Sequence, residues 1–94
     1  MQFTVEELEK VREYAGLFLS LDDIAILLEK NPDQVREDFH DTSSEFHKNY
    51  RLGQAMARRD LRIPVLKMAK HGSPQAELLA DKYISEQILS ELDG

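Results

Sequence analysis

The stretch SLDDIAILLEKNPDQVREDFHD, residues 20–41, contains two short helical patterns joined by very few residues. Ser20 suits the N-cap of the first helix, which we expect to end near Glu29. Asn31 can cap a second helix at once, because proline is favoured at the first helical position that follows it. Two helices joined so closely must cross sharply. This stretch therefore predicts a helix-turn-helix, with an inward face formed by Ile24, Ala25, Leu27, Leu28, Val35 and Phe39.

A further helix is predicted before this stretch. Thr4 and Glu7 have the spacing of a capping box, and Gly16 marks the expected end of the helix. Its apolar positions keep helical spacing and are Val5, Leu8, Val11 and Ala15. The apolar segment 17–19 is expected to drop into the core as a short connector. Residues 1–41 are thus predicted to form a tri-helical helix-turn-helix unit.

A long helix is expected to follow, beginning with a third capping box formed by Thr42 and Glu45. Pro64 removes a backbone donor, so we expect a kink near Leu61 or a short break there. One apolar face comprises Phe46, Tyr50, Gly53, Ala57 and Leu61, and a second line comprises Leu52, Met56 and Ile63. The aromatic members favour a place in the core. Because this apolar surface is wide, part of it is expected to face another helix or another subunit.

The last helix is predicted from the stop and restart at Gly72-Ser73-Pro74. Its amphipathic stripe comprises Ala76, Leu79, Ala80, Tyr83, Ile84 and Ile88. The predicted fold is therefore all-α, with a helix-turn-helix unit over residues 1–41. A helical hairpin over residues 42–94 follows as the expected self-association segment, and the two parts are expected to form one compact domain.

Composition limits the function classes. The 94 residues include no cysteine, so a disulfide framework and a thiolate metal site are excluded. No apolar run approaches the roughly 20 residues needed to span a membrane, and a cytoplasmic protein is expected. The net charge of −6 by itself argues against nucleic-acid binding, but the charge is uneven. Residues 1–45 carry −8, residues 46–71 carry +6 and residues 72–94 carry −4.

Two segments resemble a known family. The pattern Asp22-Asp23-Ile24-Ala25-Ile26-Leu27-Leu28 followed by Asn31-Pro32-Asp33-Gln34-Val35 resembles the helix-turn-helix of small DNA-binding proteins. The later segment Leu66-Lys67-Met68-Ala69-Lys70-His71-Gly72-Ser73-Pro74-Gln75-Ala76 resembles the region that follows this motif in small terminase subunits of tailed phages and prophages. The resemblance implies a subunit that binds packaging-site double-stranded DNA, and a homo-oligomer is expected from the wide apolar surface of the long helix. It also implies that ATP hydrolysis and DNA cutting belong to a separate large terminase subunit.

Two sets of residues are candidates for contacting DNA. The second helix of the motif would read bases in the major groove through Gln34, Arg36 and His40. Base reading by this helix is disfavoured by four acidic residues that would lie near DNA phosphates: Asp33, Glu37, Asp38 and Asp41. The basic side of the long helix offers the better phosphate contacts, which are Lys48, Arg51, Arg58, Arg59 and Arg62. These cations could equally form a solvated face that pairs with the acidic N-terminal unit.

Catalytic chemistry is not indicated. The histidines His40, His47 and His71 lack the spacing of a metal site, and no glycine-rich phosphate loop is present, so neither a metal nor a cofactor is expected. Adjacent acidic pairs such as Glu37 and Asp38 point to different sides of a helix. A non-enzyme is therefore expected. Two alternatives to the terminase-like function are an oligomerisation or adaptor module with an acidic protein-binding face, and a small transcriptional regulator.

Overall fold

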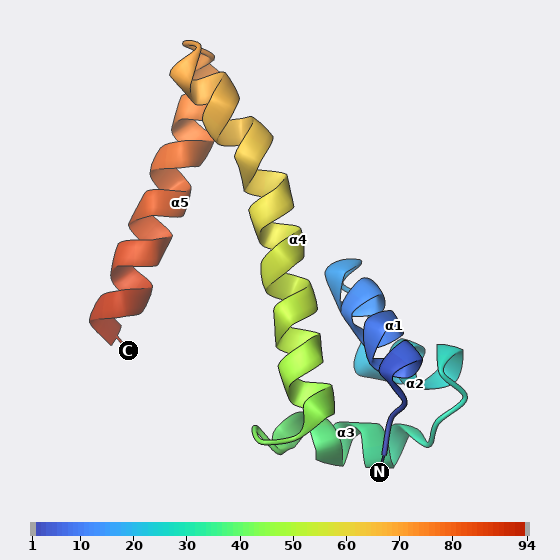
Figure 1. Cartoon of the computed structure of the whole chain (residues 1–94). Coiled ribbons are helices and arrows are strands. Elements are labelled where there is room, and N and C mark those ends of the chain that lie inside the picture. The colour runs from blue at the N-terminus through green and yellow to red at the C-terminus, as the bar shows by residue number, and fades with distance from the viewer. Residues whose placement is uncertain (1, 94) are drawn as a thin grey trace. The chain divides into compact units, whose positions relative to one another are not determined.

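The computed structural model describes residues 2–93, which contain five helices and no strand. The helices are α1 (Val5–Gly16), α2 (Leu21–Leu27), α3 (Pro32–His40), α4 (Glu45–Lys70) and α5 (Pro74–Asp93) (Figure 1). The predicted all-α class is confirmed. The chain forms two compact units, which we call unit 1 (Met1–Arg58) and unit 2 (Arg59–Gly94). The border between the two units lies inside α4. The expected division into a helix-turn-helix unit over residues 1–41 and a self-association segment over residues 42–94 stays a prediction.

The starts of the first three helices follow from local capping. The Glu7 amide donates to Thr4 Oγ1 at 3.1 Å while the Thr4 amide donates to Glu7 Oε1 at 2.9 Å, which completes the predicted capping box. The Ser20 hydroxyl oxygen accepts a hydrogen bond from the Asp23 amide at 3.1 Å. Asn31 caps α3 through its side-chain oxygen, as predicted. These caps satisfy amides that have no partner inside a helix.

The start of α4 differs from the prediction. The Thr42 capping box was wrong, because α4 begins at Glu45 and the His47 amide donates to Ser44 Oγ at 3.0 Å. The Asp41 carboxylate explains the delay, since it accepts hydrogen bonds from both the amide and the hydroxyl of Ser43. This local turn occupies the residues that would otherwise form the first helical turn.

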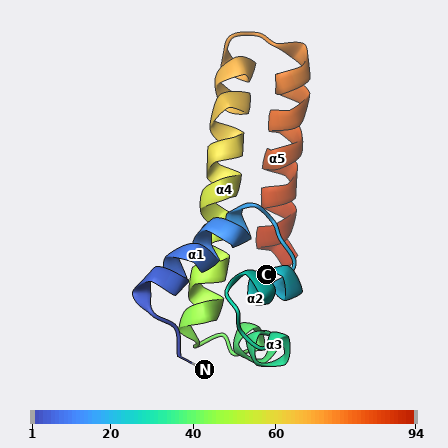
Figure 2. The same ribbon diagram turned by 90° about the vertical axis from the view of Figure 1, so that its right-hand side faces the viewer.

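The core of unit 1 draws on all four of its helices. Its fully buried side chains are Val11, Ile24, Ala25, Val35 and Phe46. Phe46 is the largest of them and comes from α4, while Tyr50 packs against the same cluster. The predicted core placement of both aromatic residues is confirmed. The tri-helical segment therefore takes an essential part of its core from the first turns of α4 (Figure 2).

Four apolar residues expected to face the core are exposed instead: Val5, Leu17, Phe18 and Leu27. The connector prediction was wrong for two of its three residues, because α1 ends in a turn that leaves only Leu19 packed against the core. In this turn the Phe18 amide donates to Ala15 O at 2.9 Å and the Leu19 amide donates to Tyr14 O at 3.3 Å. These two bonds form a Schellman motif, whose central residue takes a left-handed conformation.

Helices α1 and α4 approach each other closely within unit 1. A Cβ atom added to Gly53 would lie 2.8 Å from Arg12 Cα and 2.9 Å from Arg12 C, so only glycine fits there. Beside this contact the Arg12 guanidinium donates to Asn49 Oδ1 at 2.6 Å. The buried Asn49 side chain in turn donates to Glu45 O at 2.8 Å. A small residue and a satisfied polar pair therefore fix this helix crossing.

Unit 2 consists of the end of α4 and of α5. The stop at Gly72 is confirmed, since Gly72 has φ 88° and Ser73 accepts from the Ala76 amide at 3.4 Å. Among residues 74–92 of α5 only Ala76 and Ala80 are buried, and the larger stripe residues Leu79, Ile84 and Ile88 are exposed. An alanine side chain is too short to cover the larger residues beside it, so those residues stay in contact with water. Of the two outcomes expected at Pro64, the break is wrong because α4 continues through it, and the kink near Leu61 stays a prediction.

Acid is expected to weaken the α1 cap. The hydrogen bond from the Thr4 backbone amide lowers the pKa of Glu7 below its usual value, with a further contribution from Lys30, whose Nζ lies 2.9 Å from Glu7 Oε2. A carboxylate with a lowered pKa stabilises the fold above its unfolded-state pKa and loses this effect as the pH falls through the folded-state pKa. Glu7→Gln should therefore reduce the loss of stability below about pH 4.5. Urea unfolding at pH 3 to 7 measures this, and parallel curves for both proteins would contradict it.

Candidate nucleic-acid interface

The predicted base-reading residues lie on α3 but differ in availability. Gln34 and His40 are exposed, and the His40 ring packs edge-on against Phe39 with centroids 5.4 Å apart. Arg36 is half-buried, and its guanidinium forms ion pairs with Asp22 of α2 and, at 2.9 Å, with Asp33 of α3. A guanine contact by Arg36 would therefore require it to leave two carboxylates. This ion-paired arrangement was not predicted from the sequence.

Two of the predicted phosphate contacts are better placed. Arg51 and Arg58 on α4 are exposed, and within residues 2–93 no carboxylate lies within ion-pair distance of either guanidinium. Lys48 differs, because its Nζ lies 3.6 Å from Glu45 Oε1, although both side chains are largely exposed. Exposed pairs of this kind are weak. Unit 1 thus presents two unpaired arginines and one loosely paired lysine.

The two arginines continue a line that begins at His47. Residues 47, 51 and 58 are separated by four and seven positions, which places them on one side of a helix. We call His47, Arg51 and Arg58 the α4 row. Eleven residues at 1.5 Å per residue make the row about 16 Å long. All three members belong to unit 1, so they lie on one compact body.

Each end of the α4 row meets another element of unit 1. At one end His47 Nδ1 lies 2.6 Å from Phe39 O and donates a hydrogen bond to it, which joins the row to the end of α3. At the other end the Arg58 guanidinium lies 5.8 Å from the centre of the Phe18 ring in the turn after α1. Sequence reasoning did not identify His47 and Phe18, because only the folded arrangement brings them to the row.

The chemistry of the row fits phosphate groups. Unpaired guanidinium groups bind phosphate oxygens through charge-assisted hydrogen bonds. Comparison of the chain with protein families, curated proteins and solved structures finds no match. The charge, exposure and spacing of the row are therefore the observations that bear on function.

The remaining two predicted phosphate contacts belong to unit 2. Arg59 Nε lies 3.0 Å from Asp60 Oδ1, so its charge is partly balanced. The Arg62 guanidinium lies 4.4 Å from the centre of the Tyr83 ring, a cation–π contact between α4 and α5. Arg62 also lines a mostly apolar hollow of about 260 Å³, together with Leu66, Tyr83, Ile84, Gln87 and Ile88. These arginines are thus engaged in contacts within unit 2.

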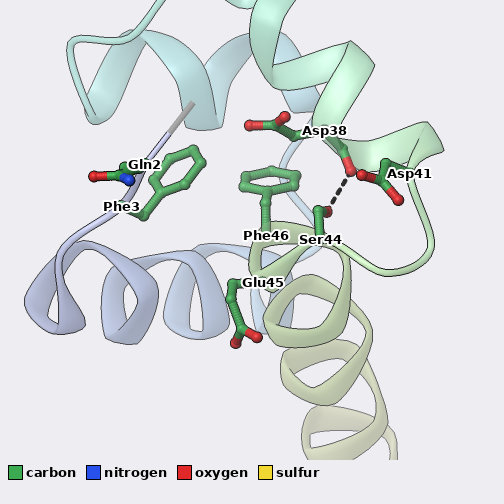
Figure 3. Close-up of a pocket in the computed structure, with 7 residues that line it drawn as sticks. All are labelled: Gln2, Phe3, Asp38, Asp41, Ser44, Glu45 and Phe46. Atoms are coloured by element: carbon green, nitrogen blue, oxygen red, sulfur yellow. Dashed lines mark hydrogen bonds between the residues drawn. The ribbon is translucent and has the colours of Figure 1, made fainter.

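A second hollow, in unit 1, is acidic. It has a volume of about 360 Å³ and lies at the turn between α3 and α4 (Figure 3). Its lining residues are Gln2, Phe3, Asp38, Asp41, Ser44, Glu45 and Phe46. The Ser44 hydroxyl donates to Asp38 O at 2.6 Å, which holds the turn against α3. The carboxylates around this hollow would repel phosphate, so the hollow lies outside the candidate interface.

The described residues contain neither a metal-binding cluster nor a membrane-spanning helix. In residues 2–93 no group of three or more histidine, aspartate or glutamate side chains is arranged to hold a metal ion. Within the same range no helix has the length and apolar character required to cross a membrane.

Proposed function

We propose that the protein binds double-stranded DNA as the recognition subunit of a packaging system resembling that of small terminases. The observation that carries this proposal is the pair of exposed, unpaired arginines, Arg51 and Arg58, on the same compact unit as α2 and α3. Phosphate neutralisation by such residues supplies most of the non-specific affinity for DNA. As the resemblance implies, a large ATPase subunit would receive the bound DNA.

In the proposed complex α3 contacts the bases of the DNA and the α4 row contacts its phosphates. Gln34 and His40 of α3 face the major groove in this arrangement, and a glutamine can pair with adenine through two hydrogen bonds. Arg51 and Arg58 neutralise the phosphates that border the groove. Arg36 holds α2 and α3 together through its two carboxylate partners and takes no part in base reading. Affinity in this proposal comes mainly from phosphates, so sequence preference is weak.

Self-association is part of the proposal. Unit 2 exposes large apolar side chains on both of its helices, including Leu61, Met68, Ile84, Ile88 and Leu89. Exposed apolar surface of this extent is typical of a protein-protein contact. In an oligomer the α4 rows of several copies would act on one DNA, and a modest single-copy affinity would become sufficient through multivalency.

A second function is supported by the acidic hollow at the α3–α4 turn. Asp41 and Glu45, two exposed acidic residues that line it, suit a basic segment of a partner protein, as the adaptor alternative requires. A small transcriptional regulator, by contrast, would share the DNA contacts of the main proposal. Measuring affinity for duplex DNA therefore separates the adaptor from the other two functions.

Fluorescence anisotropy with a labelled random duplex tests the main proposal. The wild-type protein should bind at about 50 mM salt and lose about tenfold or more in affinity by about 200 mM, because bound phosphates release counterions. Arg51→Ala/Arg58→Ala should reduce the slope of log affinity against log salt by about 2, one for each phosphate contact. The control Lys10→Ala/Lys82→Ala removes two exposed charges elsewhere and should leave the slope unchanged. Absence of duplex binding by the wild-type protein at about 50 mM salt would contradict the proposal.

A further inference from the structure

Phe18 occupies an unusual position at the end of α1. Its φ is 60°, in the left-handed region that disfavours residues other than glycine and asparagine. Its side chain is 48% exposed, so burial compensates only part of this strain. The neighbouring Leu17 is exposed as well. The Schellman motif accounts for this backbone conformation, and it places a half-exposed aromatic ring at the surface where glycine would fit without strain.

The surroundings of Phe18 suit a polyanion. Its ring packs against Arg58, which has no carboxylate partner in the described part of the chain. Arg51 lies seven residues before Arg58 on the same side of α4. The half-exposed ring thus lies beside one unpaired guanidinium, that of Arg58, and a second, that of Arg51, lies two turns away on the same side of α4. A solvent-exposed apolar side chain beside unpaired arginines is complementary to the bases and phosphates of a nucleic acid.

The length of the α4 row matches a spacing in DNA. One end of the row contacts α3 and the other contacts Phe18, with about 16 Å between them along α4. One turn of the duplex is about 34 Å, so a major groove and the adjacent minor groove are about 17 Å apart. If the end of α3 lies in the major groove and α4 runs along the duplex axis, Phe18 lies near the adjacent minor groove.

We propose that Phe18 inserts between two base pairs from the minor groove while Arg58 binds the neighbouring phosphate. The inference rests on the proposed DNA binding and adds a second point of contact to it. Apolar side chains such as phenylalanine partially unstack base steps in this way in minor-groove binders. The strained turn after α1 holds the ring away from the protein core, and this arrangement makes the ring available to DNA.

A single-tryptophan variant reports the insertion directly. The chain contains no tryptophan, so Phe18→Trp places one fluorophore at the proposed contact. Stacking on bases should quench its emission by about half when a 20-base-pair duplex saturates the protein. The control is Val5→Trp at the opposite end of α1, where the side chain is 74% exposed. Its emission should change little under the same conditions.

A second variant measures the contribution to affinity. Phe18→Gly removes the ring and suits the left-handed backbone, so the variant should fold at least as stably as the wild-type protein. Circular dichroism during heating checks this. Its affinity for duplex DNA should fall about tenfold, as expected for loss of one stacked ring. Val5→Gly is the matched control and should bind like the wild-type protein once its folding at the assay temperature is confirmed.

The outcomes separate this inference from the function on which it rests. Wild-type binding to duplex DNA with no quenching of the tryptophan and no loss of affinity in Phe18→Gly would overturn the insertion alone. Quenching by single-stranded DNA but not by the duplex would also overturn it. Failure of the wild-type protein to bind any duplex at low salt would overturn both proposals.

Discussion

Replacing Gly53 by alanine is expected to lower the free energy of unfolding by about 2 kcal/mol or more. The added Cβ would lie under 3.0 Å from the backbone of Arg12 in α1. Backbone atoms in a helix cannot rotate away as the end of a side chain can, so α1 and α4 must separate. Separation would also stretch the hydrogen bond between Arg12 and the buried Asn49, which is 2.6 Å long in the wild-type protein.

Urea unfolding followed by circular dichroism measures this effect. The matched control is Gln54→Ala, one residue along α4, where the half-buried side chain donates a long hydrogen bond of 3.3 Å to the Tyr50 hydroxyl. The control should cost less than about 1 kcal/mol, because it removes one long neutral hydrogen bond and alanine favours the helix. Alanine is the better helix former by about 1 kcal/mol, so without a close helix contact Gly53→Ala would be stabilising. A stability equal to or above wild type would therefore contradict the described crossing.

The second large effect is expected in self-association. Ile84 and Ile88 are each 54% exposed and lie one turn apart on α5, beside the hollow that Leu66 and Tyr83 also line. We expect Ile84→Asp/Ile88→Asp to convert an oligomer into a monomer of about 10.9 kDa, because a contact between copies would bury both charges. The helical content should be unchanged, since neither isoleucine belongs to a buried core.

Light scattering coupled to size-exclusion chromatography gives the mass of each species. The control Gln75→Asp/Ser85→Asp adds the same two charges to α5 at exposed polar positions and should remain oligomeric. A wild-type protein that stays monomeric at high concentration would refute self-association. An Ile84→Asp/Ile88→Asp variant with the wild-type mass would place the contact on another surface.

Local signals in the sequence predicted the helix boundaries well. Thr4, Ser20, Asn31 and Ser73 act as caps in the structure because each needs only hydrogen bonds within three residues. The start of α4 was missed for a local reason too. Before α4 the Asp41 carboxylate accepts hydrogen bonds from Ser43, and this turn forms in place of the capping box expected at Thr42.

Burial was predicted less well, because periodicity identifies an apolar face without showing what covers it. Val11 and Val35 are buried as expected, whereas Val5 and Leu27 stay exposed. In α5 the small Ala76 and Ala80 are buried, whereas larger residues such as Ile84 and Ile88 stay exposed. Whether a partner covers these faces depends on contacts that helical spacing alone does not encode.

The candidate interface was predicted in part. Arg51 and Arg58 followed from the basic side of the long helix, and the structure places both in unit 1 without carboxylate partners among the described residues. The pairing of Arg36 with Asp22 was missed, since the two residues are fourteen positions apart and meet only when α2 packs on α3. Phe18 was missed for the same kind of reason.

The most direct test of the DNA-binding claim is the salt dependence of duplex affinity for three proteins measured side by side. We predict a steep slope for the wild-type protein, the same slope for Lys10→Ala/Lys82→Ala, and a slope smaller by about 2 for Arg51→Ala/Arg58→Ala. Equal slopes for all three proteins would remove the α4 row from the interface. A wild-type protein with no measurable affinity for duplex DNA at low salt would contradict the proposed function itself.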